Sequence, residues 1–476
     1  MKRKLITSAA FSSGAKFTSR IIGLASTLIL ARVLTPSDFA MIAIIAIVIH
    51  LFDILSHTGA EQYIVQKSHL VKDDLNTAWS LDLLLKSLVC LFLIFLAPLI
   101  ANFFDKNNLI SAMQVASITL VINALRNPGL LVLKRDLDYK KIFYLSLIQR
   151  IVSFFVVIVV AVNFRSYWAF VIADIVGAIV FTIASYKVQV FRPSFSLLKV
   201  SEQWLFSKWL LGKSIIGYLR AQVDTILVAK FFGNIQLGNY HMARDVAMLP
   251  GHNILGPAIE PLLADLKDYK NDPVKLGHRV SKVLSVVAFI VVPLTAYLAF
   301  YPKLIINVLL GDQWLIAGDL LGVMSLLFFY YCFLLVIESA LTAIGKVKTI
   351  FWFDIFSLIV VVVTLLSYLQ IYNVLSLAVW LRVSIGIIST LLITITLHNL
   401  VPLKLMQVGG ALLLSASLSA TSLFLSDWLT MKLELGHIMM FLVSGGVFCT
   451  LYAVIMVALL PKLMGTTAKS ILAEFR

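Results

Sequence analysis

Residues 26–42 read STLILARVLTPSDFAMI, and residues 224–240 read DTILVAKFFGNIQLGNY. The two stretches align without a gap at an offset of 198 residues, which places Thr27 on Thr225 and Ala31 on Ala229. Each reads as the end of an apolar helix with a basic residue near its last turn, then a short turn, then a new helix. This internal repeat indicates that the chain is built from two related halves.

The composition around the repeat is typical of a membrane protein. Of the 476 residues, 60% are hydrophobic and 13% charged, and the mean hydropathy is +0.97. A bilayer-spanning helix needs about 20 mostly apolar residues, and such windows fill the chain. We predict fourteen spans, near residues 8–34, 39–57, 77–104, 109–131, 141–164, 166–187, 208–232, 237–258, 280–301, 314–343, 350–370, 374–398, 405–426 and 436–460.

The distribution of basic residues predicts the orientation of these spans. If the N-terminus is cytoplasmic, the inside segments hold 23 Lys and Arg and the outside segments hold 4. This asymmetry follows the positive-inside rule, so both termini are expected in the cytoplasm. It also explains the net charge of +15 without a nucleic-acid partner. The basic start, MKRK, reads as the flank of a retained first helix rather than a cleaved signal peptide.

Six predicted spans separate the two copies of the repeat, so both copies run in the same direction across the membrane. Parallel repeats of this kind occur in some transporters. We therefore predict an all-α polytopic membrane protein with two six-helix halves, at residues 1–190 and 208–400. A cytoplasmic linker at 191–207 joins the halves, and two additional helices with a cytoplasmic tail follow at 401–476.

The first and seventh predicted helices carry matching polar stripes. Residues three or four apart lie on one helix face, and a charge at the bilayer centre costs about 2.5–3.5 kcal/mol on insertion scales. Two such stripes on equivalent helices indicate a shared polar cavity. The stripe residues are Ser12, Lys16, Arg20, Gly23 and Thr27 in the first helix, and Lys213, Gly217, Arg220 and Asp224 in the seventh. The other intramembrane charges are Asp53, Asp82, Lys86, Arg150, Asp174, Arg244, Asp245, Glu338, Asp354 and Arg382.

Each of these charges also has a structural interpretation. Arg220 and Asp224 are spaced i,i+4 and can neutralise each other. Asp82 and Lys86 have the same spacing. The basic residues near the ends of the two repeat helices are explained by capping of the last carbonyl groups.

Lys16, Arg20 and Lys213 lack a partner of opposite sign on their own helix, so we expect them to line the transport path. A cationic cavity suits an anionic cargo, because Arg presents a planar fork to phosphate oxygens and Lys a mobile point charge. The candidate cavity cations are Lys16, Arg20, Lys213, Arg220, Arg150 and Arg244.

Signals for enzymatic chemistry are absent from the sequence. Gly212-Lys213-Ser214 looks like the end of a phosphate-binding loop, but Ser207 stands where that loop needs Gly. Cys90, Cys332 and Cys449 lie in apolar stretches without metal-ligand spacing and are expected to be small buried hydrophobes. The predicted outside loops are too short for an enzyme domain. We therefore predict a transporter with no metal and no cofactor.

Several stretches resemble bacterial polysaccharide exporters of the Wzx type. This family belongs to a superfamily that also contains multidrug extruders and lipid II flippases, and the colanic-acid and exopolysaccharide exporters look most similar. The resemblance covers roughly residues 1–400. The matching stretches are residues 14–20, 30–39, 59–66, 133–141, 224–233, 237–240 and 311–314.

The resemblance implies a function and a location. The cargo would be an undecaprenyl-diphosphate-linked oligosaccharide repeat unit, flipped from the cytoplasmic to the periplasmic leaflet of the bacterial inner membrane by alternating access. Membrane lipids and other polysaccharide assembly proteins would be its partners. The diphosphate would lie near Lys16, Arg20, Lys213 and Arg220. Coupling to a proton or sodium gradient would involve Asp53, Asp224 or Glu338, because burial raises the pKa of a carboxylate.

Three alternatives remain open at this stage. An ion-coupled drug or small-molecule antiporter could use the same fold, but it predicts a cavity dominated by carboxylates. A membrane polysaccharide polymerase or glycosyltransferase predicts a long external loop or an acidic metal motif. A regulatory membrane protein would not need charges on the inner faces of two equivalent helices.

Overall fold

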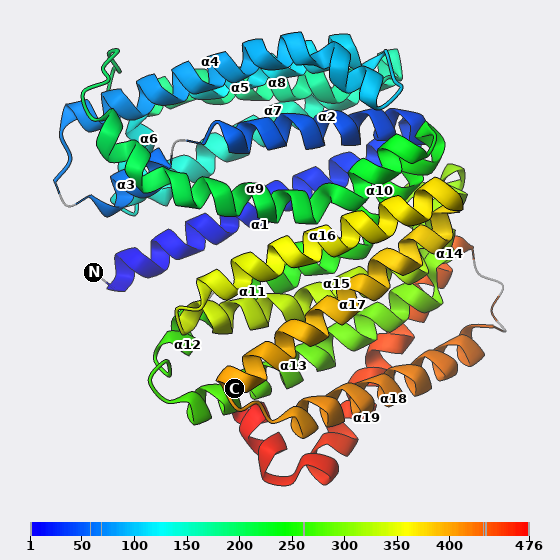
Figure 1. The fold of residues 1–476 in the computed structure, drawn as a ribbon. Helices are drawn as coiled ribbons and strands as arrows, with labels where there is room; N and C mark the ends of the chain where they lie inside the picture. Colours follow the sequence, from blue (N-terminus) through cyan, green and yellow to red (C-terminus); the bar gives the residue numbers. More distant parts are fainter. Residues whose placement is uncertain are drawn as a thin grey trace. The chain divides into compact units, whose positions relative to one another are not determined.

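The computed structural model describes residues 2–57, 59–67, 69–259, 262–431, 433 and 436–474, and these ranges contain helices and no strand (Figure 1). The helices are α1 (Lys2–Val33), α2 (Pro36–Leu55), α3 (Ala60–Gln66), α4 (Lys72–Phe103), α5 (Leu109–Ala124), α6 (Gly129–Arg135), α7 (Tyr139–Phe164), α8 (Trp168–Val188), α9 (Val200–Phe231), α10 (Asn234–Pro250), α11 (Gly256–Ile259), α12 (Leu262–Lys267), α13 (Pro273–Phe300), α14 (Pro302–Leu310), α15 (Leu315–Ala343), α16 (Val347–Ile371), α17 (Leu375–Leu400), α18 (Leu405–Thr430) and α19 (His437–Glu474).

The prediction of an all-α polytopic membrane protein is confirmed. Among the described residues, ten helices are long and apolar enough to cross a membrane, and the bent pair α5–α6 makes up to eleven. The predicted count of fourteen also needs α1, α9 and α10 as spans. Helices α1 and α9 have 32 residues each, which is ample length, but they carry the charged stripes that lower their hydropathy.

The side chains of the long helices are distributed as in a protein immersed in lipid. On α4, large apolar side chains such as Leu88, Phe95 and Leu99 are exposed, Phe95 by 77%. Asp74 and Ser80, on the same helix, are fully buried. This pattern is the reverse of that in a water-soluble helix, and it fits a surface covered by acyl chains.

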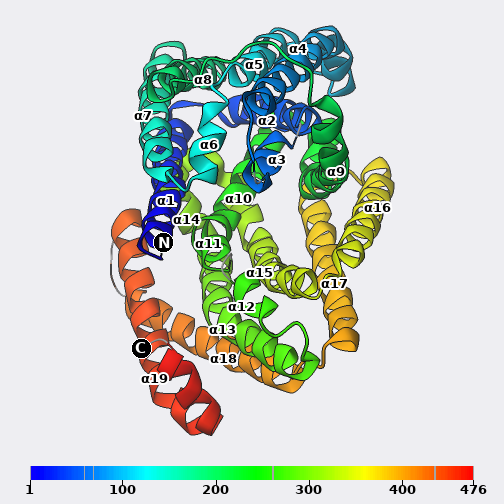
Figure 2. The ribbon, with the colours of Figure 1, turned by 90° about the vertical axis from the view of Figure 1, so that its left-hand side faces the viewer.

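The chain packs as two compact units, residues 1–241 with 354–375 and residues 242–353 with 376–476. In the first unit α1, α7, α8, α5 and α4 lie side by side in a curved row, seen end-on in Figure 2, and α2 packs against α5 and α9. In the second unit α13 packs against α15 and α18, and α18 packs against α19. The predicted halves at 1–190 and 208–400 stay a prediction.

The internal repeat reappears in the helix boundaries. Helix α1 runs Lys2–Val33 and α9 runs Val200–Phe231, and the helices that follow start at Pro36 and Asn234, so each boundary is displaced by 198 residues. The predicted layout of helix, short turn and new helix is therefore confirmed for both copies.

The predicted single helix at 109–131 is wrong, because the structure breaks it into α5 and α6 with a bend of 65°. The break falls at Asn127-Pro128-Gly129, where proline disfavours a helical conformation of the residue before it. Asn127 is 1% exposed and holds the break: its backbone N–H donates to Ser185 Oγ at 3.0 Å, and its side-chain oxygen accepts from the Gly129 N–H at 2.9 Å.

A proline inside α13 leaves a carbonyl without its helical donor, and a distant tyrosine supplies the replacement. Pro293 cannot donate to Phe289 O, four residues before it. The Tyr452 hydroxyl of α19 donates to that oxygen at 2.9 Å and also contacts Ser415 Oγ of α18 at 2.9 Å. Phe289, Ser415 and Tyr452 are all buried. The Tyr452 hydroxyl therefore links α13, α18 and α19 within the second unit by hydrogen bonds that water does not reach.

Candidate functional site

A polar cavity of about 520 Å³ lies inside the first unit. Its walls come from the ends of α2 and α6, from α3 and α4, from the α5–α6 break, and from α7 and α8. Ionised groups and amides lie among these apolar helices, which is the arrangement expected of a polar path through a membrane. The charged and amide side chains of the wall are Asp53, Glu61, Gln62, Asp82, Lys86, Asn123, Arg126, Asn127, Lys134 and Gln149.

A single lysine joins two carboxylates in this wall. Lys86 Nζ lies 3.1 Å from Asp82 Oδ2, one helical turn away on α4, and 3.5 Å from Asp53 Oδ1 on α2. The Lys86 side chain is 10% exposed, and the two carboxylates are about one quarter exposed, 27% and 26%. The cluster therefore carries one net negative charge facing the cavity.

Arg126 supplies the balancing positive charge from the α5–α6 break. Its guanidinium lies 4.3 Å from the centre of the Phe181 ring and donates to Asn123 Oδ1 at 2.5 Å. No ion pair of Arg126 with a carboxylate occurs among the described residues, and its Nε–H is buried without a hydrogen-bond partner. This guanidinium thus has donors to spare for a ligand in the cavity.

A third basic group lies where α3 and α6 meet. Lys134 Nζ is 2.5 Å from Glu61 Oε2, and this pair is more exposed than the Lys86 cluster. With three acidic and three basic side chains, the wall is close to neutral and rich in both donors and acceptors. Such a wall suits a ligand with many hydroxyl groups. Within the described ranges, no group of three or more His, Cys, Asp and Glu side chains could hold a metal ion.

A second cluster of charges centres on α9, the helix of the second repeat copy. Arg220 Nη1 lies 3.1 Å from Asp354 Oδ1 of α16. One turn along α9, Asp224 is 1% exposed and accepts from the Tyr240 hydroxyl of α10 at 2.9 Å. All four residues belong to the first unit. The sequence offered only an Arg220–Asp224 pair within one helix, whereas the structure connects each residue to a different neighbouring helix.

The structure brings some of the predicted site residues together and leaves others apart. Asp53 joins the cavity cluster, and Arg220 and Asp224 join the α9 cluster. Lys16 and Arg20 lie on α1, exposed and half-buried, and Arg150 is exposed on α7; none of the three is among the described residues that line the cavity. Arg244 on α10 and Glu338 on α15 are half-buried and belong to the second unit. The Lys213 side chain lies outside the described residues.

The structure confirms two of the structural interpretations of the charges. The i,i+4 pair of Asp82 with Lys86 is confirmed. Lys230, near the end of α9, pairs with Asp105 at 2.8 Å, as expected for a residue at a helix end. The expectation of three buried cysteines holds for two of them and is wrong for Cys449, which is exposed on α19 among residues facing lipid.

Sequence reasoning missed Arg126 and the amides beside it, because they were assigned to an unbroken apolar helix. The signal was present in Asn127-Pro128-Gly129, since Pro and Gly mark a break and broken helices in membranes occur where backbone lines a cavity. The pairing of Asp53 with Lys86 was also missed, because 33 residues separate them in the chain.

Comparison with known proteins gives consistent matches. Residues 29–318 match the profile of a family described as polysaccharide biosynthesis protein. The lipopolysaccharide biosynthesis protein WzxC of Escherichia coli (strain K12) is 25% identical over 325 residues, 66% of this chain and 65% of the relative, so the chain matches less than two thirds of its length.

Two solved structures show the same fold. A lipid II flippase MurJ in an inward closed conformation has a TM-score of 0.75 at 16% identity, covering 95% of this chain and 99% of the other. A multidrug resistance MATE family transporter of the MOP superfamily, inward-facing, has a TM-score of 0.62 at 16% identity, covering 80% and 95%. Because the family profile matches more than half of the 476 residues, the chain belongs to the polysaccharide biosynthesis protein family.

Proposed function

We propose that this protein flips undecaprenyl-diphosphate-linked oligosaccharide repeat units from the cytoplasmic to the periplasmic leaflet of the bacterial inner membrane, by alternating access, for surface polysaccharide biosynthesis. The observation that carries the proposal is the polar cavity inside the apolar helices of a polysaccharide biosynthesis family member. Both termini lie in the cytoplasm in this proposal, as the distribution of Lys and Arg predicts.

The cavity has the size and chemistry for the sugar part of this cargo. Its volume of about 520 Å³ lies within the usual 300–1,000 Å³ of small-molecule sites. Sugar hydroxyls both donate and accept hydrogen bonds, and the wall offers amides, carboxylates and the spare donors of Arg126. The lipid tail needs no protein site, because it stays among the acyl chains.

The diphosphate is proposed to bind the predicted cations Lys16, Arg20, Lys213 and Arg220. Arg220 is the best supported of these, because its ion pair with Asp354 fixes the guanidinium in place and an arginine presents a planar fork to phosphate oxygens. Arg150 and Arg244 stay weaker candidates, on α7 and α10.

Energy for transport is proposed to come from a proton or sodium gradient acting on buried carboxylates. Asp224 is the strongest candidate, because it is 1% exposed within the apolar helices and its carboxylate accepts from the Tyr240 hydroxyl. Asp53 shares Lys86 with Asp82, so it can take up a proton without leaving the lysine unpaired. Glu338 stays a candidate in the second unit.

Transport is better supported than an enzymatic function, because the family assignment and the flippase-like fold both point to it. The main rival is drug export on the same fold. That function predicts a cavity dominated by carboxylates, whereas the wall of this cavity carries as many basic as acidic side chains.

Ligand binding to the detergent-purified protein separates these functions. The proposal expects thermal stabilisation by an undecaprenyl-diphosphate oligosaccharide, weaker stabilisation by undecaprenyl diphosphate, and none by undecaprenol or by ethidium. Arg126→Ala should bring the thermal stabilisation by the oligosaccharide-bearing ligand closer to that by undecaprenyl diphosphate, because the substitution removes a proposed sugar contact. Stabilisation by ethidium alone would contradict the proposal and favour drug export.

A further inference from the structure

Helices α4 and α9 are joined at both of their ends. Each has 32 residues, or about 48 Å at 1.5 Å per residue, whereas the hydrocarbon core is about 30 Å thick. Both belong to the first unit and run in the same direction, because their N-terminal ends contact each other and so do their C-terminal ends. Their two meeting points therefore lie at opposite faces of the membrane.

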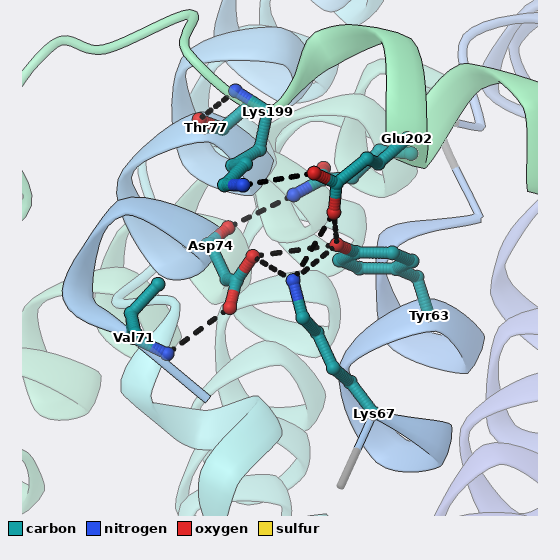
Figure 3. A network of polar contacts seen from close by, with 8 residues as sticks. Tyr63, Lys67, Val71, Asp74, Thr77, Lys199 and Glu202 are labelled. Carbon is teal, nitrogen blue, oxygen red and sulfur yellow. Dashed lines mark hydrogen bonds and ion pairs between the residues drawn. The ribbon is translucent and has the colours of Figure 1, made fainter. Parts of the chain in front are cut away.

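The meeting point at the N-terminal ends is a network of five side chains, here named the N-end clasp: Tyr63, Lys67, Asp74, Lys199 and Glu202 (Figure 3). Lys67 Nζ lies 2.7 Å from Asp74 Oδ1 and 3.2 Å from Glu202 Oε2. The Tyr63 hydroxyl donates to Glu202 Oε2 at 2.8 Å. Lys199 Nζ donates to Glu202 Oε1 at 2.8 Å.

This network divides into two parts that are each electrically neutral. On the α3–α4 side, the fully buried Asp74 keeps Lys67 and the Val71 N–H, the latter at 3.0 Å. On the α9 side, Glu202 is 46% exposed and keeps Lys199. Separation of the two parts would therefore leave no buried charge without a partner, which is the usual obstacle to breaking an ion-pair network.

The contacts that cross between the two parts are of two kinds, exposed and buried. The bonds of Tyr63 and Lys67 to Glu202 are exposed. The bond from Gln203 Nε2 to the Asp74 carbonyl oxygen at 3.0 Å and the bond from the Lys199 N–H to Thr77 Oγ1 at 3.3 Å involve the fully buried side chains of Gln203 and Thr77. Exposed ion pairs contribute little to stability, because water replaces the lost contacts. The exposed bonds of Tyr63 and Lys67 to Glu202 can thus break and re-form at low cost.

The meeting point at the C-terminal ends, here named the C-end clasp, has the same character. Lys230 Nζ lies 2.8 Å from Asp105 Oδ2, a carboxylate that is 72% exposed. Lys106 Nζ donates at 2.9 Å to the Ala229 carbonyl oxygen, one of the last carbonyls of α9. Asp105 adopts a left-handed conformation (φ 56°) in the turn after α4, which presents both side chains to α9.

The N-end clasp is also attached to the polar cavity. Tyr63 and Lys67 belong to the same short helix and C-cap as Glu61 and Gln62, which line the cavity. A movement of α3 away from α9 would therefore shift part of the cavity wall. In this structure both clasps are closed.

We propose that the two clasps are the gates of the transport cycle, with the N-end clasp opening to admit the head group of the cargo and the C-end clasp opening to release it. The proposal rests on the transport function proposed above. Glu202 is the positioning residue of the N-end clasp, because the contacts of Tyr63 and Lys67 across the clasp both end on its carboxylate. Opening at one end leaves the other closed, so no continuous pore forms.

Distance measurements test the gate without any cargo. Spin labels at Gln66→Cys and Ser201→Cys, two exposed positions on the two sides of the N-end clasp, are introduced into a Cys449→Ser background in nanodiscs. Double electron–electron resonance should show two distance populations, and Glu202→Gln should raise the longer one about threefold. A single distance that is the same with and without Glu202→Gln would overturn the proposal, whatever the transport activity.

Reversible cross-linking then connects the gate to transport. Lys67→Cys with Glu202→Cys, joined by a short thiol-specific reagent, should lower flipping about tenfold and recover after reduction. Lys199→Cys with Glu202→Cys is the matched control, because this pair lies on one side of the clasp and its cross-link should leave the rate unchanged. Full activity of the cross-linked 67–202 pair would overturn the gate. Absence of flipping in the wild type would instead count against the proposed function.

Discussion

Arg220 of α9 and Asp354 of α16 form an ion pair of 3.1 Å, with side chains 23% and 7% exposed. Removal of one partner from a largely buried pair leaves an uncompensated charge, whereas removal of both does not. We therefore expect Asp354→Asn to lower the free energy of unfolding by about 3 kcal/mol. The free energy of unfolding should fall by less in the double variant Arg220→Met with Asp354→Leu, as measured by thermal unfolding in detergent. Equal losses in the two variants would show that the pair does not act as a unit.

The Lys86 cluster should respond asymmetrically to substitution. Lys86→Met leaves Asp53 and Asp82 facing each other without a cation, whereas Asp53→Asn or Asp82→Asn leaves Lys86 with one carboxylate. We expect the free energy of unfolding to fall by about 2 kcal/mol in Lys86→Met and by under about 1 kcal/mol in either aspartate variant. Thermal unfolding of the three variants checks this order, and a larger loss for either aspartate variant than for Lys86→Met would contradict it.

The bond between Tyr452 and the Phe289 carbonyl should stabilise the second unit. Tyr452→Phe removes the hydroxyl that donates to the carbonyl left free by Pro293, and hydrogen bonds within membrane proteins contribute about 0.6–1.7 kcal/mol. We therefore expect Tyr452→Phe to lower the free energy of unfolding by about 1 kcal/mol. Tyr372→Phe, at a position 66% exposed, is the control and should have no effect. Identical melting temperatures for the two variants would contradict this account.

Close backbone approach makes one glycine irreplaceable. A Cβ added to Gly238 of α10 would lie 1.8 Å from the Pro36 carbonyl oxygen of α2, and backbone cannot move aside cheaply. Gly238→Ala should destabilise the protein by about 2 kcal/mol through overpacking. Gly23→Ala in α1, where nothing lies within 4 Å, should be neutral or stabilising by up to about 1 kcal/mol. Similar melting temperatures for both variants would show that α2 and α10 are not in contact there.

The N-end clasp should not respond to pH in the physiological range. Hydrogen bonds from Lys199, Tyr63 and Lys67 lower the pKa of Glu202 from 4.5 to about 2. The stability that the ionised Glu202 gives to the clasp is therefore fully present above pH 4.5 and is lost only as the pH falls through about 2. The bonds to Asp74 and Tyr63 raise the pKa of Lys67 above its usual 10.5, so the contribution of its charged form is fully present below 10.5.

It follows that the distance distribution between labels at positions 66 and 201 should be the same from about pH 5 to pH 9. Any pH dependence of transport must then arise at other groups, of which Asp53 and Asp224 are the proposed ones. A shift to the longer distance at pH 5 would show that protons act on the clasp itself.

The sequence predicts the helices well, because a bilayer imposes long apolar windows and the positive-inside rule on any chain that crosses it. The repeat at residues 26–42 and 224–240 also predicts the boundaries of α1 and α9. The break at Asn127-Pro128-Gly129 was missed because apolar residues flank it on both sides, so hydropathy alone shows one continuous helix.

The candidate site was only partly predictable for a different reason. Pairs within one helix, such as Asp82 with Lys86, follow from spacing alone. Pairs between helices, such as Arg220 with Asp354, depend on how helices far apart in the chain pack together, and no local pattern contains that information. The same limit applies to the N-end clasp, in which Tyr63 and Glu202 are 139 residues apart.

The most direct test of the proposed function is transbilayer movement of a fluorescent undecaprenyl-diphosphate oligosaccharide in liposomes that contain the purified protein. Wild type is compared with Arg20→Ala, Lys213→Ala and empty liposomes, with and without an ion gradient. The account predicts rapid protein-dependent movement that both substitutions slow by about tenfold, since each removes a cation from the proposed diphosphate path. Movement in wild-type liposomes that is no faster than in empty liposomes, both with and without the ion gradient, would contradict the proposed function.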